Sequence, residues 1–563
     1  MQFVIEEVLG AGLAWAEIPD FAGIDIDTAC QVLDAAGKFA SEVLAPFNSI
    51  GDLQGCTWSD GAVRTPDGYR AAYSAFVEAG WASLACQAEH GGQGLPILLN
   101  AAFNEMIAAA NHGWTMYPGL LHGAYECLKT HGSEELKERY LPKIVNGEWL
   151  ATMNLTEPQA GSDLGLVRSK AEFRADGSWL ITGSKIFISG GEHDLTDNIV
   201  HLVLARLPDA PAGTKGLTLF LAPKILPDGS RNAIRCDGIE KKMGIKGSAT
   251  CAMSLDGATA WMVGEPHRGL GAMFVMMNSA RLHVGLQGLG HLEMAQQNAH
   301  VYANERVQGR GAVIAHHPAV RRTLWGLRAL TEGQRVIAYW TAQLIDEAHH
   351  HPDAGRREQA EGLVGLLTPV VKAFLTENGH RGADEALQVW GGYGYVHEYG
   401  IEQTVRDSRI AMIYEGTNEI QSIDLMRKVL GDGGARLDSL LTLLESEPVA
   451  LDARVPLAEF RAALRAQTSS ARGCMKALLD GREADPEWPL RVADDFLRGL
   501  GLTLLAWAWA RRAYTSLPKA GDAWYDEKFR TARFGVQWLL PEASLRWQRV
   551  LARESYLPDA LAV

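Results

Sequence analysis

The chain has 563 residues, of which 47% are hydrophobic and 21% charged, and its formal net charge at pH 7 is −14. At about 100–200 residues per domain, this length predicts about three to five domains with sizeable cores. The composition argues against wholesale disorder, and the negative charge argues against a uniformly basic nucleic-acid-binding protein. Seven widely spaced cysteines, with neither a CxxC pair nor zinc-ligand spacing, are typical of reduced thiols in the cytoplasm.

Apolar runs along the chain are too short to cross a membrane. The nearest candidate, Gly499–Ala510, has arginines on both sides and falls short of the ~18 residues that a membrane helix needs. This run predicts a buried helix. The first residues also lack the basic segment of a signal peptide. We therefore expect a soluble, cytoplasmic protein that does not associate with membranes.

The first part of the chain, to about Asn154, has apolar residues at the three- and four-residue spacings of helices. Gly91–Pro96 (GGQGLP) interrupts this pattern as a loop that needs the backbone freedom of glycine. We place an N-terminal helical domain at residues 1–154. Its predicted helices cover Ala29–Leu44, Tyr69–Val77, Leu98–Ala110 and Glu134–Val145.

Between about Leu155 and Glu265 the apolar period changes to two, which is typical of strands. Asp176 and Gly177 mark the turn of a hairpin. We place a middle β domain at residues 155–269. Its predicted strands cover Ala171–Phe173, Trp179–Thr182, Ile199–Leu204, Leu217–Leu221 and Cys251–Leu255, the last of them ending before Asp256-Gly257.

The helical period returns at about Leu270 and continues to about Leu430, where Gly431–Gly434 (GDGG) predicts a linker. We place a helical domain at residues 270–432 and a helical extension at residues 433–563. The order of a helical domain, a β domain, a helical domain and a helical extension assigns the chain to the α+β class.

Generic cofactor motifs do not account for this sequence. Gly285–Gly290 (GLQGLG) lies inside a helical run with no strand before it, so it does not fit a Rossmann dinucleotide site. His349–His351 precedes Pro352, and we interpret this run as solvated surface instead of a metal site. The sequence therefore predicts no metal centre.

Two segments combine residues that suggest chemistry. The first, Asn154–Asp163 (NLTEPQAGSD), places hydroxyls, acids, proline and glycine where the helical domain meets the β domain. Its hydroxyls and exposed backbone N–H groups could grip the polar edge of a cofactor. An ordinary interdomain turn has the same composition, so the composition by itself leaves both interpretations open.

The second segment is Ile413–Gln421 (IYEGTNEIQ). Glu415, flanked by Ile413 and Tyr414, could be a desolvated base with a pKa raised towards the working pH. The segment could also begin a helix, with Thr417 or the next residue as its N-cap. The two interpretations are compatible, because a catalytic carboxylate can directly precede a helix.

With these segments the sequence resembles the acyl-CoA dehydrogenase family over about residues 30–435. The matching motifs are Leu155–Asp163, Gly183–Ser189 (GSKIFIS), Lys242–Ser248 (KMGIKGS), Arg281, Glu305-Arg306, Gln388–Tyr395 (QVWGGYGY) with Glu398 and Asp407, and Ile413–Gln421. They occur in the family's order. The resemblance implies an N-terminal helical domain, a central β-barrel-like domain and a C-terminal four-helix bundle, here followed by a helical C-terminal extension.

The resemblance also implies an activity. Glu415 would remove the α-proton of an acyl-CoA thioester while the β-hydrogen leaves as hydride to N5 of FAD, which gives a trans-2-enoyl-CoA. The backbone N–H of Glu415 and a flavin hydroxyl would hold the thioester carbonyl. Some family members carry the base just before the arginine that matches Arg281. That position is Ala280 here, so the resemblance assigns the base to Glu415.

The family's binding residues can be carried over position by position. Substrate contacts fall at Ser162, Arg281 and Gly416. FAD contacts, some of them across a subunit boundary, fall at Thr156, Phe187, Ser189, Arg306, Gln388, Gly391, Gly392, Thr417 and Asn418.

The chain departs from the family pattern at a few positions. Phe187 and Ser189 replace the commoner Trp and Thr but keep an aromatic face and a hydroxyl, and Gln403 replaces a usual Lys or Arg. With the long tail, these features resemble a subgroup that includes 3-methylthiopropionyl-CoA dehydrogenases and broad-range fatty acyl-CoA dehydrogenases. Trp114, Tyr117 and Trp390 could shorten the acyl cavity or could be plain core residues.

The implied enzyme is a homodimer or tetramer that passes electrons to an electron-transfer flavoprotein, and two alternatives remain. An acyl-CoA oxidase would reoxidise its flavin with O₂. A DNA-associated alkylation-response flavoprotein of the same superfamily would bind DNA through its tail. The tail's arginines are interleaved with acids, which favours a solvated helical face. They are Arg511, Arg512, Arg530, Arg533, Arg546, Arg549 and Arg553.

Overall fold

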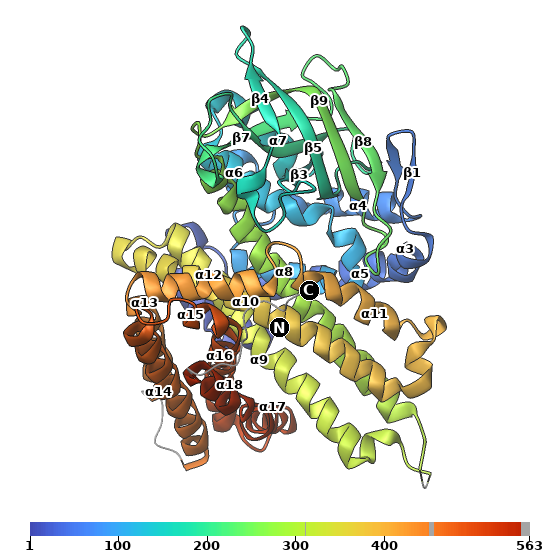
Figure 1. Cartoon of the computed structure of the whole chain (residues 1–563). Coiled ribbons are helices and arrows are strands. Elements are labelled where there is room, and N and C mark those ends of the chain that lie inside the picture. Colours follow the sequence, from blue (N-terminus) through green and yellow to red (C-terminus); the bar gives the residue numbers. More distant parts are fainter. Residues whose placement is uncertain (310, 450–454, 553–563) are drawn as a thin grey trace, which may run out of the picture.

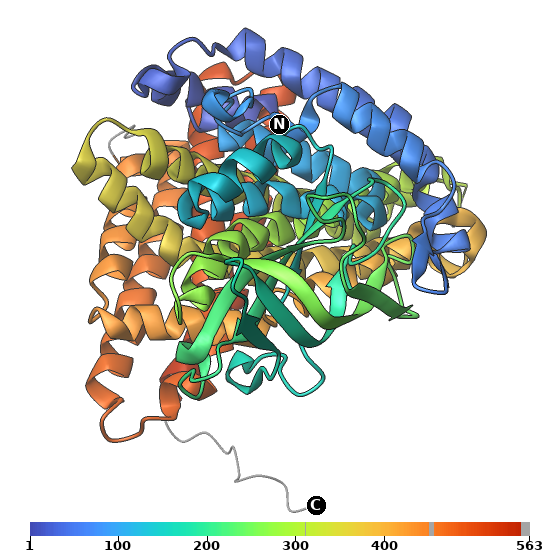
Figure 2. The ribbon, with the colours of Figure 1, turned by 90° about the horizontal axis from the view of Figure 1, so that it is seen from above.

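The computed structural model describes residues 1–309, 311–449 and 455–552. Figure 1 shows the β domain at the top of the view and a larger helical part below it. Figure 2, seen from above, shows the N-terminal helices on one side of the β strands. The helical, β and helical order predicted from the sequence is therefore the order of the structure.

The N-terminal part is mostly helical, as predicted. Its elements are α1 (Ala11–Ala16), α2 (Ile26–Lys38), α3 (Asn48–Gln54), β1 (Thr57–Ser59), β2 (Ala62–Arg64), α4 (Tyr69–Glu78), α5 (Ile97–Thr115), α6 (Leu121–His131) and α7 (Glu134–Val145). Asp25 caps α2 by accepting a hydrogen bond from the backbone N–H of Thr28, and Ser133 caps α7 in the same way. The hairpin β1–β2 is an addition that the helical prediction for residues 1–154 misses.

Aromatic side chains fill the core between these helices. Trp81 stacks on Phe103 with ring centroids 4.5 Å apart. Trp114 is fully buried and donates its indole N–H to the carbonyl of Tyr69. Tyr117 is also buried. Trp114 and Tyr117 are therefore core residues.

The middle domain is a closed sheet. Its strands are β3 (Leu150–Asn154), β4 (Lys170–Phe173), β5 (Trp179–Ser189), β6 (Ile199–Arg206), β7 (Leu217–Pro223), β8 (Ile234–Ile239) and β9 (Thr250–Val263). Strands β6, β4, β5, β9 and β7 are bonded in that order, and β7 also pairs with β6. This ring is the predicted barrel-like domain. β3 pairs with β6 and β8 pairs with β9 outside the ring.

Three strands differ from the sequence prediction. The helical period was expected to run to about Asn154, but β3 is a strand whose five residues are all buried, so its sequence has no alternation to detect. β8 was not predicted. β9 was expected to end before Asp256-Gly257, but it continues through these residues to Val263, because Gly257 is accommodated as an extra, unpaired residue opposite Ile181 and Thr182 of β5.

The helical domain consists of α8 (Gly269–Glu305), α9 (Pro318–His350), α10 (Ala354–Trp390), α11 (Ile401–Ser408) and α12 (Asn418–Gly431). α8 and α10 lie side by side and touch backbone to backbone at glycines. A Cβ atom on Gly379 would lie 2.3 Å from the carbonyl oxygen of Gly288, and one on Gly285 would lie 3.0 Å from the carbonyl oxygen of Val371. These contacts fix the spacing of the two helices near the candidate site.

The extension packs against the helical domain. Its helices are α13 (Ala435–Val449), α14 (Ala458–Gly481), α15 (Trp488–Arg491), α16 (Ala493–Ser516), α17 (Ala523–Phe534) and α18 (Glu542–Leu551). The predicted break falls between α12 and α13, and the predicted buried helix Gly499–Ala510 is the buried centre of α16. Within the described residues, no helix is both long enough and apolar enough to cross a membrane.

The histidine run is less exposed than predicted. His349 and His350 end α9, and the side chain of His351 is only 6% exposed and accepts a hydrogen bond from the backbone of Asp353 at 3.0 Å. The prediction of a solvated run is therefore wrong for His351. The part of the chain that the structure describes holds no cluster of three or more side chains suited to a metal ion. All seven cysteines lie in that part and are free thiols.

Candidate active site

Glu415 lies in a strained turn that precedes α12. Its φ is +58° and that of Gly416 is +83°, so two consecutive residues adopt the left-handed conformation. This conformation is costly for a glutamate and is frequently found at functional sites. Gln421 on α12 supports the turn by donating its side-chain N–H to the carbonyl of Glu415 at 2.9 Å. Thr417 is the N-cap of α12, as the helix-start interpretation predicted.

Two cations from two different helices act on Glu415. Burial raises the pKa of Glu415 to about 7, and the positive charges of Arg281 on α8 and Lys372 on α10 oppose this rise. Arg281 also pairs with Asp424 at 3.2 Å. The result is a carboxyl group whose pKa lies near neutral pH, which suits a general base.

Lys372 is the charged residue that the sequence analysis missed. It is fully buried, and its ammonium donates to the carbonyl of Gly416 at 2.8 Å and to the side-chain oxygen of Asn418 at 3.0 Å. Burial lowers the pKa of Lys372 to about 7, and the charge of Glu415 opposes this fall. A single lysine in the apolar run Pro369–Leu375 was a sequence signal that could have found it.

Tyr414 joins a buried polar network on the other side of the turn. Its hydroxyl contacts the side-chain oxygen of Gln287 and lies 3.1 Å from Nε2 of His112, whose Nδ1 lies 2.9 Å from Nε2 of His291. Burial lowers the pKa of His112 to about 4, so this network is uncharged at neutral pH. Ile413, expected to shield Glu415, is instead 47% exposed. The surroundings of Glu415 therefore come from α8, α10 and α12.

The turn that follows β3 is fastened to β5 by a buried ion pair. The carboxylate of Glu157 accepts from Lys185 at 2.8 Å, and from the hydroxyl of Ser169 at 2.6 Å. Lys185 is fully buried and also donates to the carbonyls of Leu155 and Leu204. Salt bridging and hydrogen bonds lower the pKa of Glu157 to about 2, although burial opposes this change. These contacts hold the Leu155–Asp163 motif against the strand.

Phe187 is the second strained residue among the predicted site residues. Its φ is +59°, and the strand breaks register between Lys185 and Ile188, so the ring is 59% exposed at the edge of the barrel. Thr156 lies beside it, because its carbonyl accepts from the backbone of Ile186 at 2.9 Å. An exposed aromatic face beside hydroxyl groups suits a planar ring with polar edges.

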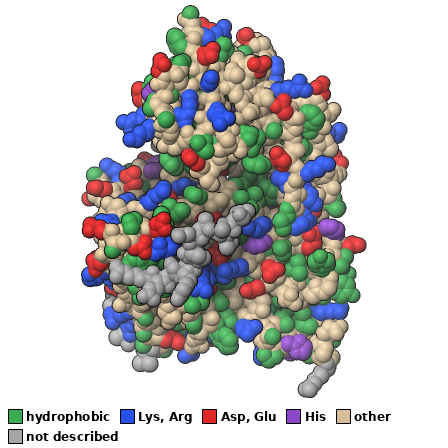
Figure 3. Space-filling view, in the orientation of Figure 1, with side chains coloured by type: hydrophobic (Ala, Val, Ile, Leu, Met, Phe, Trp, Pro, Cys, Tyr) green, Lys and Arg blue, Asp and Glu red, His purple; other side chains and the backbone are tan. Residues whose placement is uncertain are grey.

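A large cavity lies on the two helices that carry Arg281 and Lys372. Towards their N-terminal ends α8 and α10 border this cavity of about 1100 Å³, which is lined by residues of the helical parts of the chain. Figure 3 shows a separate indentation of the surface between the β domain and the helices below it. α8 lines the cavity with Asn278 and Leu282, which flank Arg281 along the helix. α10 lines it with Thr368, one helical turn before Lys372. The cavity is therefore lined by residues near the two cations in the sequence of α8 and α10, although Glu415 itself does not line it.

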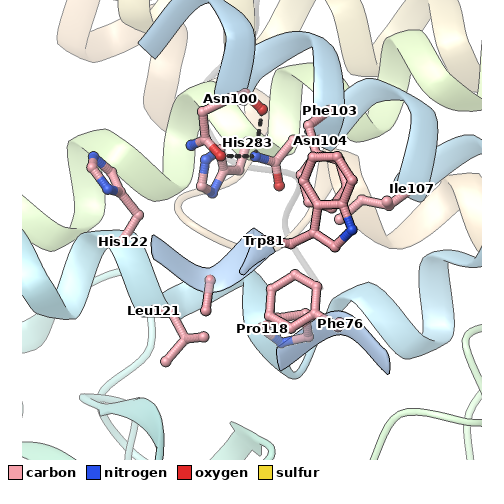
Figure 4. Close-up of a pocket in the computed structure, with 11 residues that line it drawn as sticks. Phe76, Trp81, Asn100, Phe103, Asn104, Ile107, Pro118, Leu121, His122 and His283 are labelled. Carbon is pink, nitrogen blue, oxygen red and sulfur yellow. Dashed lines mark hydrogen bonds between the residues drawn. The ribbon is translucent and has the colours of Figure 1, made fainter. Parts of the chain in front are cut away.

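A small inner chamber of about 30 Å³ shares lining residues with this cavity, among them Asn100, His122 and His283. Figure 4 shows the ring of Trp81 and the paired side chains of Asn100 and Asn104 around it. Asn104 donates to the carbonyl of Asn100 at 2.7 Å. The chamber has room for about two water molecules.

The remaining predicted cofactor residues lie elsewhere. Arg306, Gly391 and Gly392 line a groove of about 470 Å³, where the guanidinium of Arg306 lies over the Tyr393 ring at 5.1 Å. Gln388 is exposed near it on α10. Arg306 follows Arg281 by 25 residues of α8, which is about 37 Å along the helix. None of the barrel-edge residues Thr156, Phe187 and Ser189 lines this groove.

Two of the predicted binding residues, Asn418 and Ser162, have surroundings that the sequence did not indicate. Both ends of the Asn418 amide are bound to α10, because its nitrogen donates to the carbonyl of Ala373 at 3.2 Å while its oxygen accepts from Lys372. Ser162 is exposed in the turn before η8 (Leu164–Leu166).

Two polar atoms near Glu415 are available to a ligand. Nε of Arg281 and Oε1 of Gln421 are buried without a hydrogen-bond partner among the described residues, so a ligand could bind them.

Comparison with known proteins agrees with this arrangement. The chain matches the N-terminal, middle and C-terminal domains of acyl-CoA dehydrogenase over residues 27–148, 152–258 and 267–430, and an acetyl-CoA dehydrogenase C-terminal-like domain over residues 437–559. It is 41% identical to 3-methylmercaptopropionyl-CoA dehydrogenase of Ruegeria pomeroyi, over 94% of this chain and 93% of the relative.

Two further comparisons extend over nearly the whole chain. The broad-specificity linear acyl-CoA dehydrogenase FadE5 of Mycobacterium tuberculosis is 34% identical, over 96% of this chain and 94% of the relative. An acyl-CoA dehydrogenase of Bacillus anthracis, solved in complex with FAD, has the same fold, with a TM-score of 0.78 at 22% identity over 95% of this chain and 90% of that one. The chain belongs to the acyl-CoA dehydrogenase family.

Proposed function

We propose that this protein catalyses the FAD-dependent α,β-dehydrogenation of an acyl-CoA thioester to a trans-2-enoyl-CoA, with Glu415 as the general base. The observation that carries the proposal is the setting of Glu415. A carboxyl group with a pKa near 7 lies in a strained turn beside two cations, and the two helices that carry these cations also border a cavity of about 1100 Å³. Membership of the family supports the same reaction.

The residues at the barrel edge fit FAD. Thr156 and Ser189 offer hydroxyls, and Phe187 offers an exposed aromatic face for the isoalloxazine ring. When bound, FAD supplies the acceptor for the β-hydrogen as hydride. The buried pair of Glu157 and Lys185 keeps this part of the barrel in place.

The chain itself supplies the proton chemistry. Glu415 takes the α-proton, and the positive charges of Arg281 and Lys372 favour its ionised form. We assign the backbone N–H of Glu415 to the thioester carbonyl, where it would stabilise developing negative charge. Gly416 contributes to the substrate contact by continuing the left-handed turn. The cavity between α8 and α10 is the proposed acyl-CoA site, and Ser162 would contact the substrate from the β domain.

The groove at Arg306 favours a homodimer. Arg306, Gly391 and Gly392 line a groove that includes none of the barrel-edge residues Thr156, Phe187 and Ser189, and Gln388 is exposed near it. We therefore propose that they contact FAD bound by a second copy, in a dimer or a pair of dimers. Thr417 and Asn418 would contact FAD through backbone groups, since their side chains serve the helix cap and α10.

Product analysis tests this proposal. The protein would be incubated with 3-methylmercaptopropionyl-CoA, butyryl-CoA and longer linear acyl-CoAs, with an electron-transfer flavoprotein as acceptor. We expect stoichiometric 2-enoyl-CoA, and its absence with every substrate would contradict the proposal. Oxygen uptake matching product formation without the flavoprotein would instead assign the chain as an oxidase. Free thiols and the proposed soluble partner both favour a cytoplasmic location.

A further inference from the structure

Lys372 is a charged residue in a fully buried position, which is unfavourable unless the charge has a role. It is on α10 within an apolar run, its side chain has no exposed surface, and taking an ammonium group out of water costs several kcal/mol. A methionine or glutamine of similar length could fill the same space at lower cost. Buried ionisable groups with shifted pKa values cluster at functional sites.

The contacts of Lys372 all point to the segment that carries the base. Its ammonium donates to the carbonyl of Gly416 at 2.8 Å and to the side-chain oxygen of Asn418 at 3.0 Å. Both acceptors are neutral, so these bonds leave the positive charge uncancelled. Because Gly416 directly follows Glu415, the first bond also restrains the left-handed turn in which the base lies.

Two cations act on Glu415 from the helices packed against its turn. Arg281 of α8 has the larger effect on the Glu415 carboxyl and is also paired with Asp424 of α12 at 3.2 Å. From α12, Glu419 is exposed and adds negative charge near Lys372. Lys372 is therefore the cation whose hydrogen bonds, among the described residues, are all made to neutral oxygens.

We propose that Lys372 is a positioning residue for Glu415, which ties the turn to α10 and, when protonated, adds to the positive charge of Arg281 that favours the ionised carboxylate. This inference rests on the proposed function only for the role of Glu415 as base. The physical claim, that Lys372 contributes to the ionisation of Glu415, is independent of the substrate.

The test compares Lys372→Gln, Lys372→Met and Lys372→Arg in the purified, FAD-loaded protein. The protonated carboxyl of Glu415 is followed by infrared difference spectroscopy against pH, with Glu415→Gln as the subtracted reference. We expect the Gln and Met variants to raise the midpoint of the Glu415 titration by about one pH unit or more, because an opposite charge has been removed. Lys372→Arg keeps the charge and should leave the midpoint within about half a pH unit. The acid limb of kcat/KM should move by the same amount.

Lys528→Gln is the control. Lys528 on α17 is a largely buried lysine whose charge is paired with Glu332 of α9, and it is not among the charges that act on Glu415. Its removal should leave the titration of Glu415 in place. The proposal is overturned if Lys372→Gln, folded as judged by thermal unfolding, titrates like the parent, or if Lys528→Gln shifts the midpoint equally. A parent protein that no acyl-CoA reduces would overturn the proposed function, whereas the infrared titration would still decide the role of Lys372.

Discussion

At the scale of single residues, Glu415 is a carboxyl group whose charged form is disfavoured by burial. Glu415 has a pKa of about 7, raised by burial from an ordinary value of 4.5. The folded protein therefore binds more protons than the unfolded chain between about pH 4.5 and 7, and the contribution of Glu415 to stability is lost as pH rises through this window. A carboxyl group with this pKa can both take and release a proton near neutral pH, as the proposed role of Glu415 requires.

Glu415→Gln should therefore stabilise the protein at alkaline pH. Relative to the parent, its free energy of unfolding should rise between pH 5 and pH 8 by at most about 3 kcal/mol, as measured by urea denaturation. Glu419→Gln is the control, because Glu419 is exposed and its pKa is lowered by hydrogen bonding to Thr417, which reverses the sign of the effect. A parent and a Glu415→Gln variant with parallel stability curves would show that Glu415 is not held out of water.

Some properties of single residues could be predicted from the sequence, and others could not. The motif around Glu415 predicted a carboxyl group with a raised pKa, and the helix-start interpretation gave Thr417 as the N-cap. Lys372 escaped because its partners, Gly416 and Asn418, lie more than forty residues away and meet it only after α10 and α12 have packed together. The exposure of Ile413 was also unpredictable, since apolar neighbours in the sequence do not determine which side of a turn faces the core.

At the scale of elements, the geometry of the site depends on how closely α8 and α10 approach. Gly379 lies against the backbone of Gly288, and Gly285 lies against Val371. Arg281 is one turn before Gly285 and Lys372 directly follows Val371, so the two cations stand where the helices meet. The glycine-rich run Gly285–Gly290 therefore has a packing role.

Gly379→Ala should separate these helices. A methyl group would lie 2.3 Å from the Gly288 carbonyl, and overpacking of this kind costs about 2–3 kcal/mol. We expect a lower urea midpoint and a lower kcat/KM together, because Arg281 and Lys372 move with the helices. Gly326→Ala on α9 has no neighbouring atom within 4 Å and should be neutral or gain up to about 1 kcal/mol from helix propensity. Equal stability of the two variants would contradict the close helix contact.

Helices and strands whose buried and exposed residues alternate regularly along the sequence were the ones that could be predicted. α7 (Glu134–Val145) was predicted with its exact bounds because a serine cap, acidic first turn and apolar stripe coincide. β3 was missed because it is buried on both faces, so its sequence has no period of two. β8 was missed because its weak pattern is interrupted by the bulge between Cys236 and Gly238. In both strands the tertiary setting, not local sequence, decides the structure.

At the scale of the whole molecule, the extension is part of the core. Trp509 on α16 donates its indole N–H to the carbonyl of Ala329 on α9 at 2.9 Å. Glu332 on α9 binds Arg512 of α16 and Lys528 of α17. These cations lower the pKa of Glu332 to about 2, against the effect of burial. One buried carboxylate therefore joins two helices of the extension to the helical domain.

Glu332→Gln should loosen the extension. It leaves buried cations facing a neutral group, and breaking a buried ion pair in this way costs about 3 kcal/mol or more. The variant should unfold at lower urea and be cleaved faster by protease at Gly431–Gly434, between α12 and α13. Glu148→Gln, which breaks a pair with Lys143 whose side chains are 41% and 49% exposed, should change stability by less than about 1 kcal/mol. Indistinguishable unfolding and cleavage of the two variants would show that the extension is held by apolar packing alone.

The same packing bears on the DNA-binding alternative. Arg512 is buried against Glu332, Arg533 pairs with Glu459, and both Arg546 and Arg549 contact Asp495. Arg553 lies outside the described residues. The paired arginines agree with the sequence interpretation of a charge-mixed helical face, and they give the DNA-binding alternative no support.

The most direct test of the central claim is flavin reduction in a single anaerobic mixing experiment. The FAD-loaded parent and Glu415→Gln are each mixed with the acyl-CoA that the parent turns over fastest, and the visible absorbance of the flavin is followed. The account predicts rapid bleaching in the parent and a rate at least about a hundredfold lower in the variant, because the general base is missing. A Glu415→Gln protein that binds FAD and bleaches at the rate of the parent would contradict the assignment of Glu415 as the base.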